Sequence, residues 1–188
     1  METQKAATRD GYGKALLELG KINPNVVALD ADLSDSTRSE YFAKQFPERF
    51  FSMGIAEQDM IGAAAGLAFS GKIPYASTFA VFSERAYEFV RNVVSRNKLN
   101  VKITGSHAVI FTGEDGKSAQ AIEDIAAYRA LPNMIVLQPC DSVETEKMVF
   151  ALADYKGPSY MRIHSNPVPI IHSLDYKFEI VKGEILKQ

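Results

Sequence analysis

The sequence predicts an α/β fold, a three-layer sandwich in which a mostly parallel sheet is covered by helices on both faces. Two observations carry this prediction. Segments with apolar residues at helical spacing alternate along the chain with short runs rich in β-branched residues, as in strands joined by helical crossovers. The 188 residues, 46% of them hydrophobic and 23% charged, also suffice for one domain with a sizeable buried core.

The first half of the chain begins with a helix that Thr8 is expected to cap and that Asn23-Pro24 ends. A short buried strand, Val26–Leu29, follows and leads to Asp30 and Asp32. After a polar stretch we expect a helix over 41–46, a strand over 49–53, a helix over 57–70 and a strand over 73–79.

The alternation continues in the second half. A helix over 83–96 is expected to carry Ala86, Phe89, Val90 and Val93 on one face. Asp141 or Ser142 should cap a later helix that ends near residue 155. The other elements expected here are strands over 101–104, 134–137 and 159–163 and a helix over 121–131.

Charge and cysteine content exclude several classes of protein. With 21 Lys and Arg against 23 Asp and Glu, the chain lacks the basic excess of a non-specific nucleic-acid binder. Its single cysteine, Cys140, excludes an intrachain disulfide and a cysteine-cluster metal site and fits a reducing compartment. The N-terminus has no signal-peptide pattern, and the longest apolar or glycine run, Ile61–Phe69, is too short to span a bilayer. We therefore expect a cytoplasmic domain with no membrane or nucleic-acid partner.

Candidate site residues lie where the predicted strands end, because ligands of open α/β sheets bind outside the carboxyl ends of the strands. Glu57 opens the most informative of these segments. One interpretation is a carboxylate that stabilises a helix dipole, by about 0.3–1 kcal/mol. The other comes from the following run, Ile61–Ala68, whose lack of bulk and charge predicts a helix buried against close neighbours. A carboxyl at the mouth of such a helix is expected to be partly buried, which suits proton chemistry, and the small residues also fit a homodimer seam.

The remaining candidates are weak signals one by one. Phe79 and Phe82 follow a strand and are either core residues or an aromatic platform for a ligand. The acidic turn over 113–116 lacks the ligand count of a calcium or zinc site. His107 and His164 both follow predicted strands and are candidates for a cleft. The motifs GxGxxG and GxxxxGK[ST] do not occur, which argues against a generic nucleotide-binding domain.

Taken together, these segments resemble the transketolase family of thiamine diphosphate enzymes, in particular its middle, pyrimidine-binding (Pyr) domain. The resemblance keeps the family's order over nearly all of residues 6–165. It is most similar to the C-terminal subunit of two-piece transketolases, with 1-deoxyxylulose-5-phosphate synthase as the nearest rival. The segments that carry it are ATRDGYGKAL (7–16), VVALDADLSDST (26–37), FPERFFSMGIAEQDMIGAAAGLAFSG (46–71), STFAVFSERAYEFVR (77–91), GEDGKSAQAIEDIAAYRALPNMIVLQPCD (113–141) and GPSYMRI (157–163).

The resemblance implies a binding site for the aminopyrimidine ring of thiamine diphosphate. Glu57 stands in the family motif GIAEQ, whose glutamate hydrogen-bonds ring nitrogen N1′ and promotes loss of the proton from thiazolium C2. Phe79 and Phe82 match the aromatic residues that wall the ring, and Asp32 matches an acidic residue near the cofactor at the subunit boundary. A GDG…N motif on a separate domain binds the diphosphate and Mg²⁺ in this family. That motif does not occur here, so the chain is expected to hold no metal and to supply half a site.

Other matches imply sugar-phosphate substrates. Arg9 and Ser36 resemble the family's ligands for substrate phosphate, although Arg9 also fits a solvated residue at a helix start. His107 resembles a histidine of the substrate channel, and Asp115 resembles the carboxylate that contacts a substrate hydroxyl. The implied reaction is the transfer of a two-carbon ketol unit between sugar phosphates, with Glu57 and His107 as catalytic residues and a separate diphosphate-binding subunit or domain as partner.

Two departures favour a different outcome, a non-catalytic Pyr-like domain that serves dimerisation or regulation. The family loop typically reads GEDGx[ST]HQ, and Ala119 stands where the histidine is expected. The last strand often continues RLxR, and Ser165 stands at the place of the second arginine, which helps to hold substrate phosphate.

The resemblance also sets the expected organisation of the chain. Residues 1–165 form the Pyr domain, and residues 166–188 are a linker or the start of a C-terminal domain that is missing, with His172 facing solvent. We expect this chain to form a homodimer and to be inactive without its partner.

Overall fold

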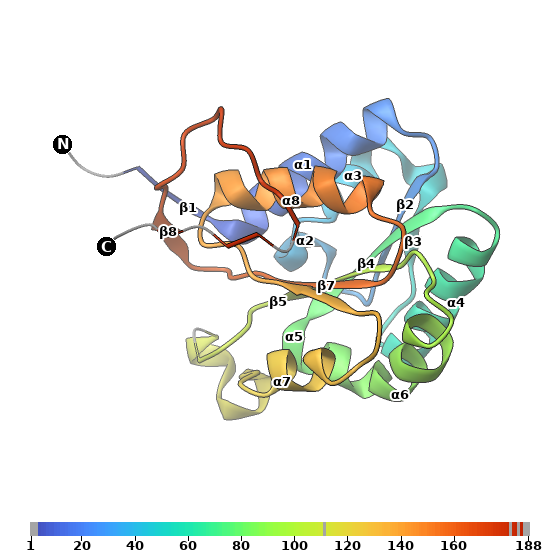
Figure 1. The fold of residues 1–188 in the computed structure, drawn as a ribbon. Helices are drawn as coiled ribbons and strands as arrows, with labels where there is room; N and C mark the ends of the chain where they lie inside the picture. The colour runs from blue at the N-terminus through green and yellow to red at the C-terminus, as the bar shows by residue number, and fades with distance from the viewer. Residues whose placement is uncertain (1–3, 111, 181, 184, 186–188) are drawn as a thin grey trace.

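The fold is built on a six-stranded sheet in which the paired strands are parallel (Figure 1). The structure, a computed structural model, describes residues 4–110, 112–180, 182–183 and 185. The strands are β1 (Lys5–Ala7), β2 (Val26–Asp30), β3 (Phe50–Ser52), β4 (Ile73–Phe79), β5 (Lys102–Ser106), β6 (Ile135–Leu137), β7 (Ser159–Arg162) and β8 (Pro167–Pro169). Their order in the main sheet is β3-β2-β4-β5-β7-β6, and β1 pairs with β8 in a separate two-stranded antiparallel sheet.

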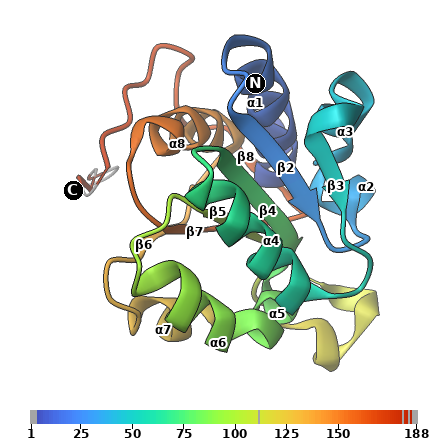
Figure 2. The same ribbon diagram turned by 90° about the vertical axis from the view of Figure 1, so that its right-hand side faces the viewer.

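Helices cover both faces of the main sheet, which confirms the predicted three-layer architecture (Figure 2). One layer holds α1 (Thr8–Ile22), α3 (Glu40–Gln45) and α8 (Ser142–Asp154), and the other holds α4 (Glu57–Phe69), α6 (Tyr87–Phe89) and α7 (Asp124–Arg129). The shorter pieces are α2 (Ser34–Thr37), α5 (Ala80–Ser83), η1 (Pro47–Arg49), η2 (Glu84–Ala86), η3 (Val90–Ser95), η4 (Gly113–Asp115) and η5 (Lys117–Ala119). In the described ranges, none of the helices has the length and apolar character needed to cross a bilayer.

A hydrophobic core lies between the sheet and each helix layer. Successive side chains of a strand point to opposite faces of the sheet and so belong to different cores. On β2, Val26 and Ala28 join the core under α1 and α8, whereas Val27 and Leu29 join the core under α4. Strands buried on both faces account for the continuous apolar run that the sequence shows at this place.

The segment predicted as one helix over 83–96 is instead a succession of short helical pieces that ends in the π-helix η3. Ala86, Val90 and Val94 are buried, whereas Phe89 and Val93, expected on the same face as Ala86 and Val90, are 38% and 37% exposed.

Helix α4 is buried on one face only. Met60, Ile61 and Ala64 pack into the core, but nothing lies within 4 Å of a Cβ built on Gly62 or Gly66. A groove of about 500 Å³ runs along this outer face between α4 and η3. The expectation of close neighbours for the glycines is thus wrong within the chain itself, and the homodimer seam stays a prediction.

The predicted roles of Thr8 as a helix cap and of His172 as a solvent-exposed residue are both wrong. Thr8 does not cap α1, because Ala7 is the N-cap and the Thr8 hydroxyl donates to the His164 carbonyl oxygen at 3.3 Å. The His172 side chain is only 6% exposed and lies against Asp141, so its predicted solvent exposure is wrong. Asp141, in contrast, caps α8 as predicted.

Candidate functional site

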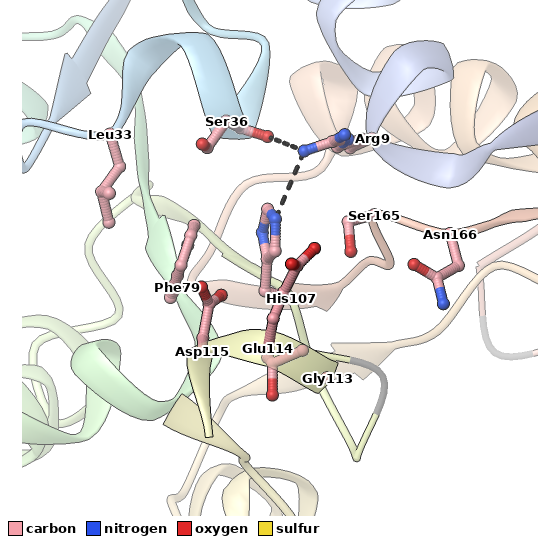
Figure 3. A pocket seen from close by; sticks show the side chains of 11 residues that line it. Arg9, Leu33, Ser36, Phe79, His107, Gly113, Glu114, Asp115, Ser165 and Asn166 are labelled. Atoms are coloured by element: carbon pink, nitrogen blue, oxygen red, sulfur yellow. Dashed lines mark hydrogen bonds between the residues drawn. The ribbon is translucent and has the colours of Figure 1, made fainter. Parts of the chain in front are cut away.

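The topology creates one site at the carboxyl edge of the sheet. The chain leaves β2 for β3 on one side and then continues through β4 and β5 on the other, so the order of strands reverses between β2 and β4. Ligands of open α/β sheets bind at such switch points. A cavity of about 760 Å³ lies there (Figure 3), lined by Arg9, Leu33, Ser36, Phe79, His107, Thr112, Gly113, Glu114, Asp115, Ser165 and Asn166.

Arg9 and His107 form one wall of the cavity (Figure 3). Arg9 Nη1 donates to the Ser36 carbonyl oxygen at 3.0 Å and contacts His107 Nε2 at 3.3 Å. Because a guanidinium has only donors, Nε2 is an acceptor, and the imidazole proton is on Nδ1, where it donates to Ser106 Oγ at 3.0 Å. Burial first, and then the charge of Arg9, lower the pKa of His107 to about 4. The ring is therefore neutral at pH 7.

An aromatic stack connects this wall to the interior. The His107 and Phe79 rings are stacked with their centroids 3.9 Å apart. Phe79 in turn lies nearly parallel to Phe82, at 5.5 Å and an interplanar angle of 8°. On Phe82 rests the Arg85 guanidinium, whose Cζ is 4.6 Å from the ring centroid.

Glu57 lies at the far end of this stack. Its side chain is 3% exposed at the first residue of α4, and Arg85 Nη1 donates to its Oε1 at 3.1 Å. The expected burial of Glu57 is confirmed. An unbroken series of contacts thus runs from the cavity through two phenylalanine rings and one arginine to a buried carboxylate.

The acidic turn η4 supplies the opposite wall of the cavity. Figure 3 shows the Glu114 and Asp115 side chains near His107, across the cavity from Arg9. A cation at one end and two carboxylates at the other can bind a molecule that carries an anionic group and several hydroxyl groups.

Five of the residues proposed from the sequence meet at this cavity: Arg9, Ser36, Phe79, His107 and Asp115. Glu57, Phe82 and Asp32 do not line it. Asp32 is exposed, just beyond β2, and its φ of 64° is in the left-handed region, as is the 54° of His107. Such backbone strain in non-glycine residues is concentrated at functional sites.

Sequence reasoning missed part of the site. Leu33, Thr112 and Asn166 line the cavity without having been singled out, and Glu114 was considered only as part of the acidic turn over 113–116. Arg85 was also missed, although a basic residue three positions after Phe82 is a detectable signal. Ser165 lines the cavity, whereas Ala119 is 7% exposed and does not.

The sequence matches a known family, described as the transketolase pyrimidine-binding domain, over residues 4–169. The chain belongs to this family. The Pyr domain is 54% identical over 181 residues to a Methanocaldococcus jannaschii protein described as a transketolase C-terminal section, covering 95% of this chain and 57% of the relative. Human transketolase is 38% identical over 183 residues, which cover 97% of this chain and 29% of the human protein.

The solved structures that are similar to this chain are also transketolases. The Pyr domain is similar to a split-gene transketolase in an inactive β4 tetramer, with a TM-score of 0.87, 54% identity and coverage of 97% of this chain and 58% of the other. Transketolase from Campylobacter jejuni follows with a TM-score of 0.84 and 28% identity, over 92% of this chain and 28% of that protein. The chain thus spans a little over half of its split relatives and less than a third of the long ones.

Proposed function

We propose that this Pyr domain supplies half of the active site of a thiamine diphosphate-dependent transketolase, which transfers a two-carbon ketol unit between sugar phosphates. The observation that carries the proposal is the series of contacts from the cavity through Phe79, Phe82 and Arg85 to Glu57. This series joins the cavity, proposed to bind a polar substrate, to the buried carboxyl of Glu57, proposed to hold a proton.

The residues present fit the aminopyrimidine end of the cofactor. Phe82 offers a flat ring on which the pyrimidine ring could stack in the place that the Arg85 guanidinium takes, worth about 0.5–1.5 kcal/mol beyond area burial. Glu57 is a buried carboxylate beside it, suited to hold a proton at ring nitrogen N1′, and Arg85 balances its charge. When bound, thiamine diphosphate supplies the carbon nucleophile that attacks a ketose carbonyl.

The cavity fits the phosphate and hydroxyl groups of a sugar phosphate. Arg9 Nε is buried and has no hydrogen-bond partner among the residues that the structure describes. An unpaired guanidinium donor at a cavity wall favours a phosphate oxygen as its ligand. Asp115 and Glu114, on the other wall, are acceptors for hydroxyl groups.

Neutral His107 is the second proposed catalytic group. With Nδ1 bonded to Ser106 and Nε2 to Arg9, its ring is held in one orientation against Phe79. A ligand that takes the hydrogen bond of Arg9 would release Nε2 as an acceptor for a substrate hydroxyl proton.

A reconstitution experiment tests the proposal. The chain is mixed with a separate subunit that carries the GDG…N motif, together with thiamine diphosphate and Mg²⁺, and ketol transfer from a ketose phosphate to an aldose phosphate is measured. Transfer that needs both chains supports the proposal. A stable two-chain complex without transfer would instead favour the non-catalytic Pyr-like domain, for which Ala119 and Ser165 argue.

A further inference from the structure

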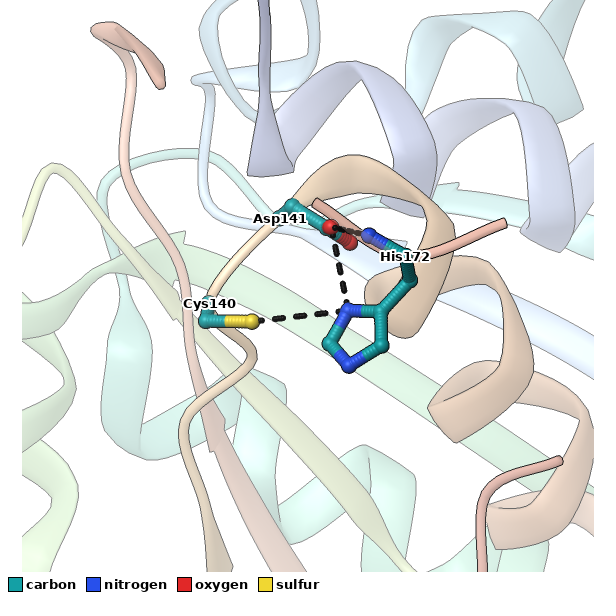
Figure 4. Close-up of side chains that lie close together, drawn as sticks. All are labelled: Cys140, Asp141 and His172. Carbon is teal, nitrogen blue, oxygen red and sulfur yellow. Dashed lines mark hydrogen bonds and ion pairs between the residues drawn. The ribbon is translucent and has the colours of Figure 1, made fainter. Parts of the chain in front are cut away.

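A cluster of three metal-ligating side chains lies apart from the cavity. Cys140 and Asp141 stand where the chain enters α8, and His172 comes from the segment after β8 (Figure 4). Cys140 Sγ is 3.6 Å from His172 Nδ1, which is 3.0 Å from Asp141 Oδ2, and the three ligand atoms all lie within 4.8 Å of one another.

We propose that Cys140, Asp141 and His172 form a binding site for a zinc-type divalent cation. Thiolate, imidazole and carboxylate are the ligands that zinc takes in proteins. At bond lengths of about 2.3 Å to sulfur and about 2.0 Å to nitrogen or oxygen, tetrahedral geometry separates sulfur from nitrogen by about 3.5 Å and nitrogen from oxygen by about 3.3 Å. The two distances in the cluster need only small adjustments to reach these values.

The ligands are held in place by hydrogen bonds that do not depend on a metal. Asp141 Oδ1 accepts the Glu144 N–H at 2.8 Å, and Oδ2 accepts the backbone N–H groups of Ile171 and His172 at 2.9 and 2.8 Å. The Cys140 N–H donates to Glu144 Oε2 at 2.7 Å, which fixes the loop that carries the thiol. Such second-layer contacts orient metal ligands and raise affinity.

The exposure of the three ligands indicates from which side a cation can reach the cluster. Asp141 and His172 have side chains that are 0% and 6% exposed, whereas Cys140 is exposed. The cation therefore reaches the cluster from the side of Cys140, where a water molecule takes the fourth position. On binding, the thiol releases its proton to solvent, and the proton that His172 Nδ1 donates to Asp141 moves to Nε2, so that Nδ1 can bind the cation. Bound there, the cation joins the segment after β8 to the start of α8.

Zinc titration of the full chain after treatment with a chelator tests the site. Competition with a chromophoric chelator should give one zinc per chain with a dissociation constant in the micromolar range or below. Cys140→Ser and His172→Phe should each weaken binding at least about 10-fold, and the control Asp175→Asn, an exposed carboxylate of the same segment, should not. Cobalt should show a thiolate-to-metal charge-transfer absorption that Cys140→Ser loses.

Asp141 is left intact because its loss would also uncap α8. Cys140→Ser should unfold at the same temperature as the unchanged chain when zinc is absent, since the thiol is exposed. The absence of binding by the unchanged chain, or equal affinity and an equal cobalt spectrum in Cys140→Ser, would overturn the proposal.

Discussion

At the scale of single residues, a substitution at Glu57 can test the proposed chemistry without disturbing the fold. Glu57→Gln keeps the shape of the side chain but removes the group that would hold a proton at N1′ of the cofactor. Its ion pair with Arg85 is half-exposed on the arginine side, so the loss to stability should be small. We expect hydrogen–deuterium exchange at C2 of bound thiamine diphosphate to be abolished in the reconstituted enzyme while the thermal unfolding midpoint hardly changes. Unchanged exchange would remove Glu57 from the mechanism.

His107 gives a prediction about pH. Its pKa of about 4 in the folded chain is below the ordinary 6.5, mainly through burial. Between these values the unfolded chain binds a proton that the folded chain does not. The contribution of His107 to stability is thus complete above pH 6.5 and is lost as the pH falls towards 4, by up to about 3 kcal/mol.

Nuclear magnetic resonance measures this pKa directly from the His107 ring signals. Arg9→Gln should raise the titration midpoint, because the cation of Arg9 is one of its causes, and Arg9→Lys should restore most of the shift. A midpoint near 6.5 in the unchanged chain would contradict the buried, neutral imidazole.

Ala119 tests the departure from the family loop. Ala119→His should raise turnover of the reconstituted enzyme, by less than the about 10²–10⁴-fold typical of a general acid–base group, because the alanine is buried and does not line the cavity. Ala119→Phe is the matched control for bulk without a proton-transfer group. Equal effects of the two substitutions would mean that the site is built around alanine.

At the scale of helices and strands, close packing distinguishes two glycines. A Cβ on Gly11 would lie 2.4 Å from the Ser142 carbonyl oxygen, where α1 meets α8, whereas a Cβ on Gly62 of α4 meets nothing within 4 Å. Gly11→Ala should therefore lower the free energy of unfolding by about 1–3 kcal/mol. Gly62→Ala should raise it by about 0.5–1 kcal/mol. Urea unfolding measures both, and equal effects would contradict the packing of α1 on α8.

The same scale shows what the sequence can and cannot predict. Val26–Asp30 was predictable because a strand buried on both faces reads as an apolar run, here Val26–Leu29. Ile73–Phe79 is also buried throughout, but Ser77 and Thr78 interrupt its apolar run. The division of the segment over 83–96 into 3-10, α and π pieces was not predictable, because such changes in hydrogen bonding leave the apolar spacing nearly helical. Strand β8 was missed because its sequence, Pro-Val-Pro, has almost no strand signal and pairs only at an edge.

The site was predictable only in parts. The strand ends located Phe79 and His107, and the family resemblance added Arg9, Ser36 and Asp115, which the fold brings to one cavity. Contacts between segments far apart in sequence leave no local pattern. The pairing of Arg85 with Glu57 and the burial of His172 against Asp141 belong to this class and appear only in the folded chain.

For the molecule as a whole, we expect the chain alone to bind thiamine diphosphate poorly. In the proposed function the Pyr domain would supply ring contacts and a carboxyl for the pyrimidine end, but its sequence has no GDG…N motif for the diphosphate and Mg²⁺. Calorimetry with cofactor and Mg²⁺ measures this. Micromolar, Mg²⁺-dependent binding by the chain alone would contradict the half-site.

The open face of α4 predicts self-association. Gly62, Gly66 and Phe69 line the groove on this face, and Phe69 is 83% exposed. We expect a two-fold homodimer in sedimentation, which Gly66→Arg should convert to monomers by placing a charge in the seam. A monomeric unchanged chain would contradict the seam.

The small sheet of β1 and β8 places Lys5 opposite Pro169 and Ala7 opposite Pro167. The chain therefore enters the layered core, through β1, and leaves it, through β8, at the same corner of the molecule. A domain whose two ends lie close together can be inserted into a longer chain, or occur without it, while its core stays the same. The relatives fit this geometry, since the same stretch makes up 57% of the Methanocaldococcus jannaschii protein and 29% of the human one. The pairing of two three-residue strands thus brings both ends of the layered core together, an arrangement that tolerates insertion into longer chains.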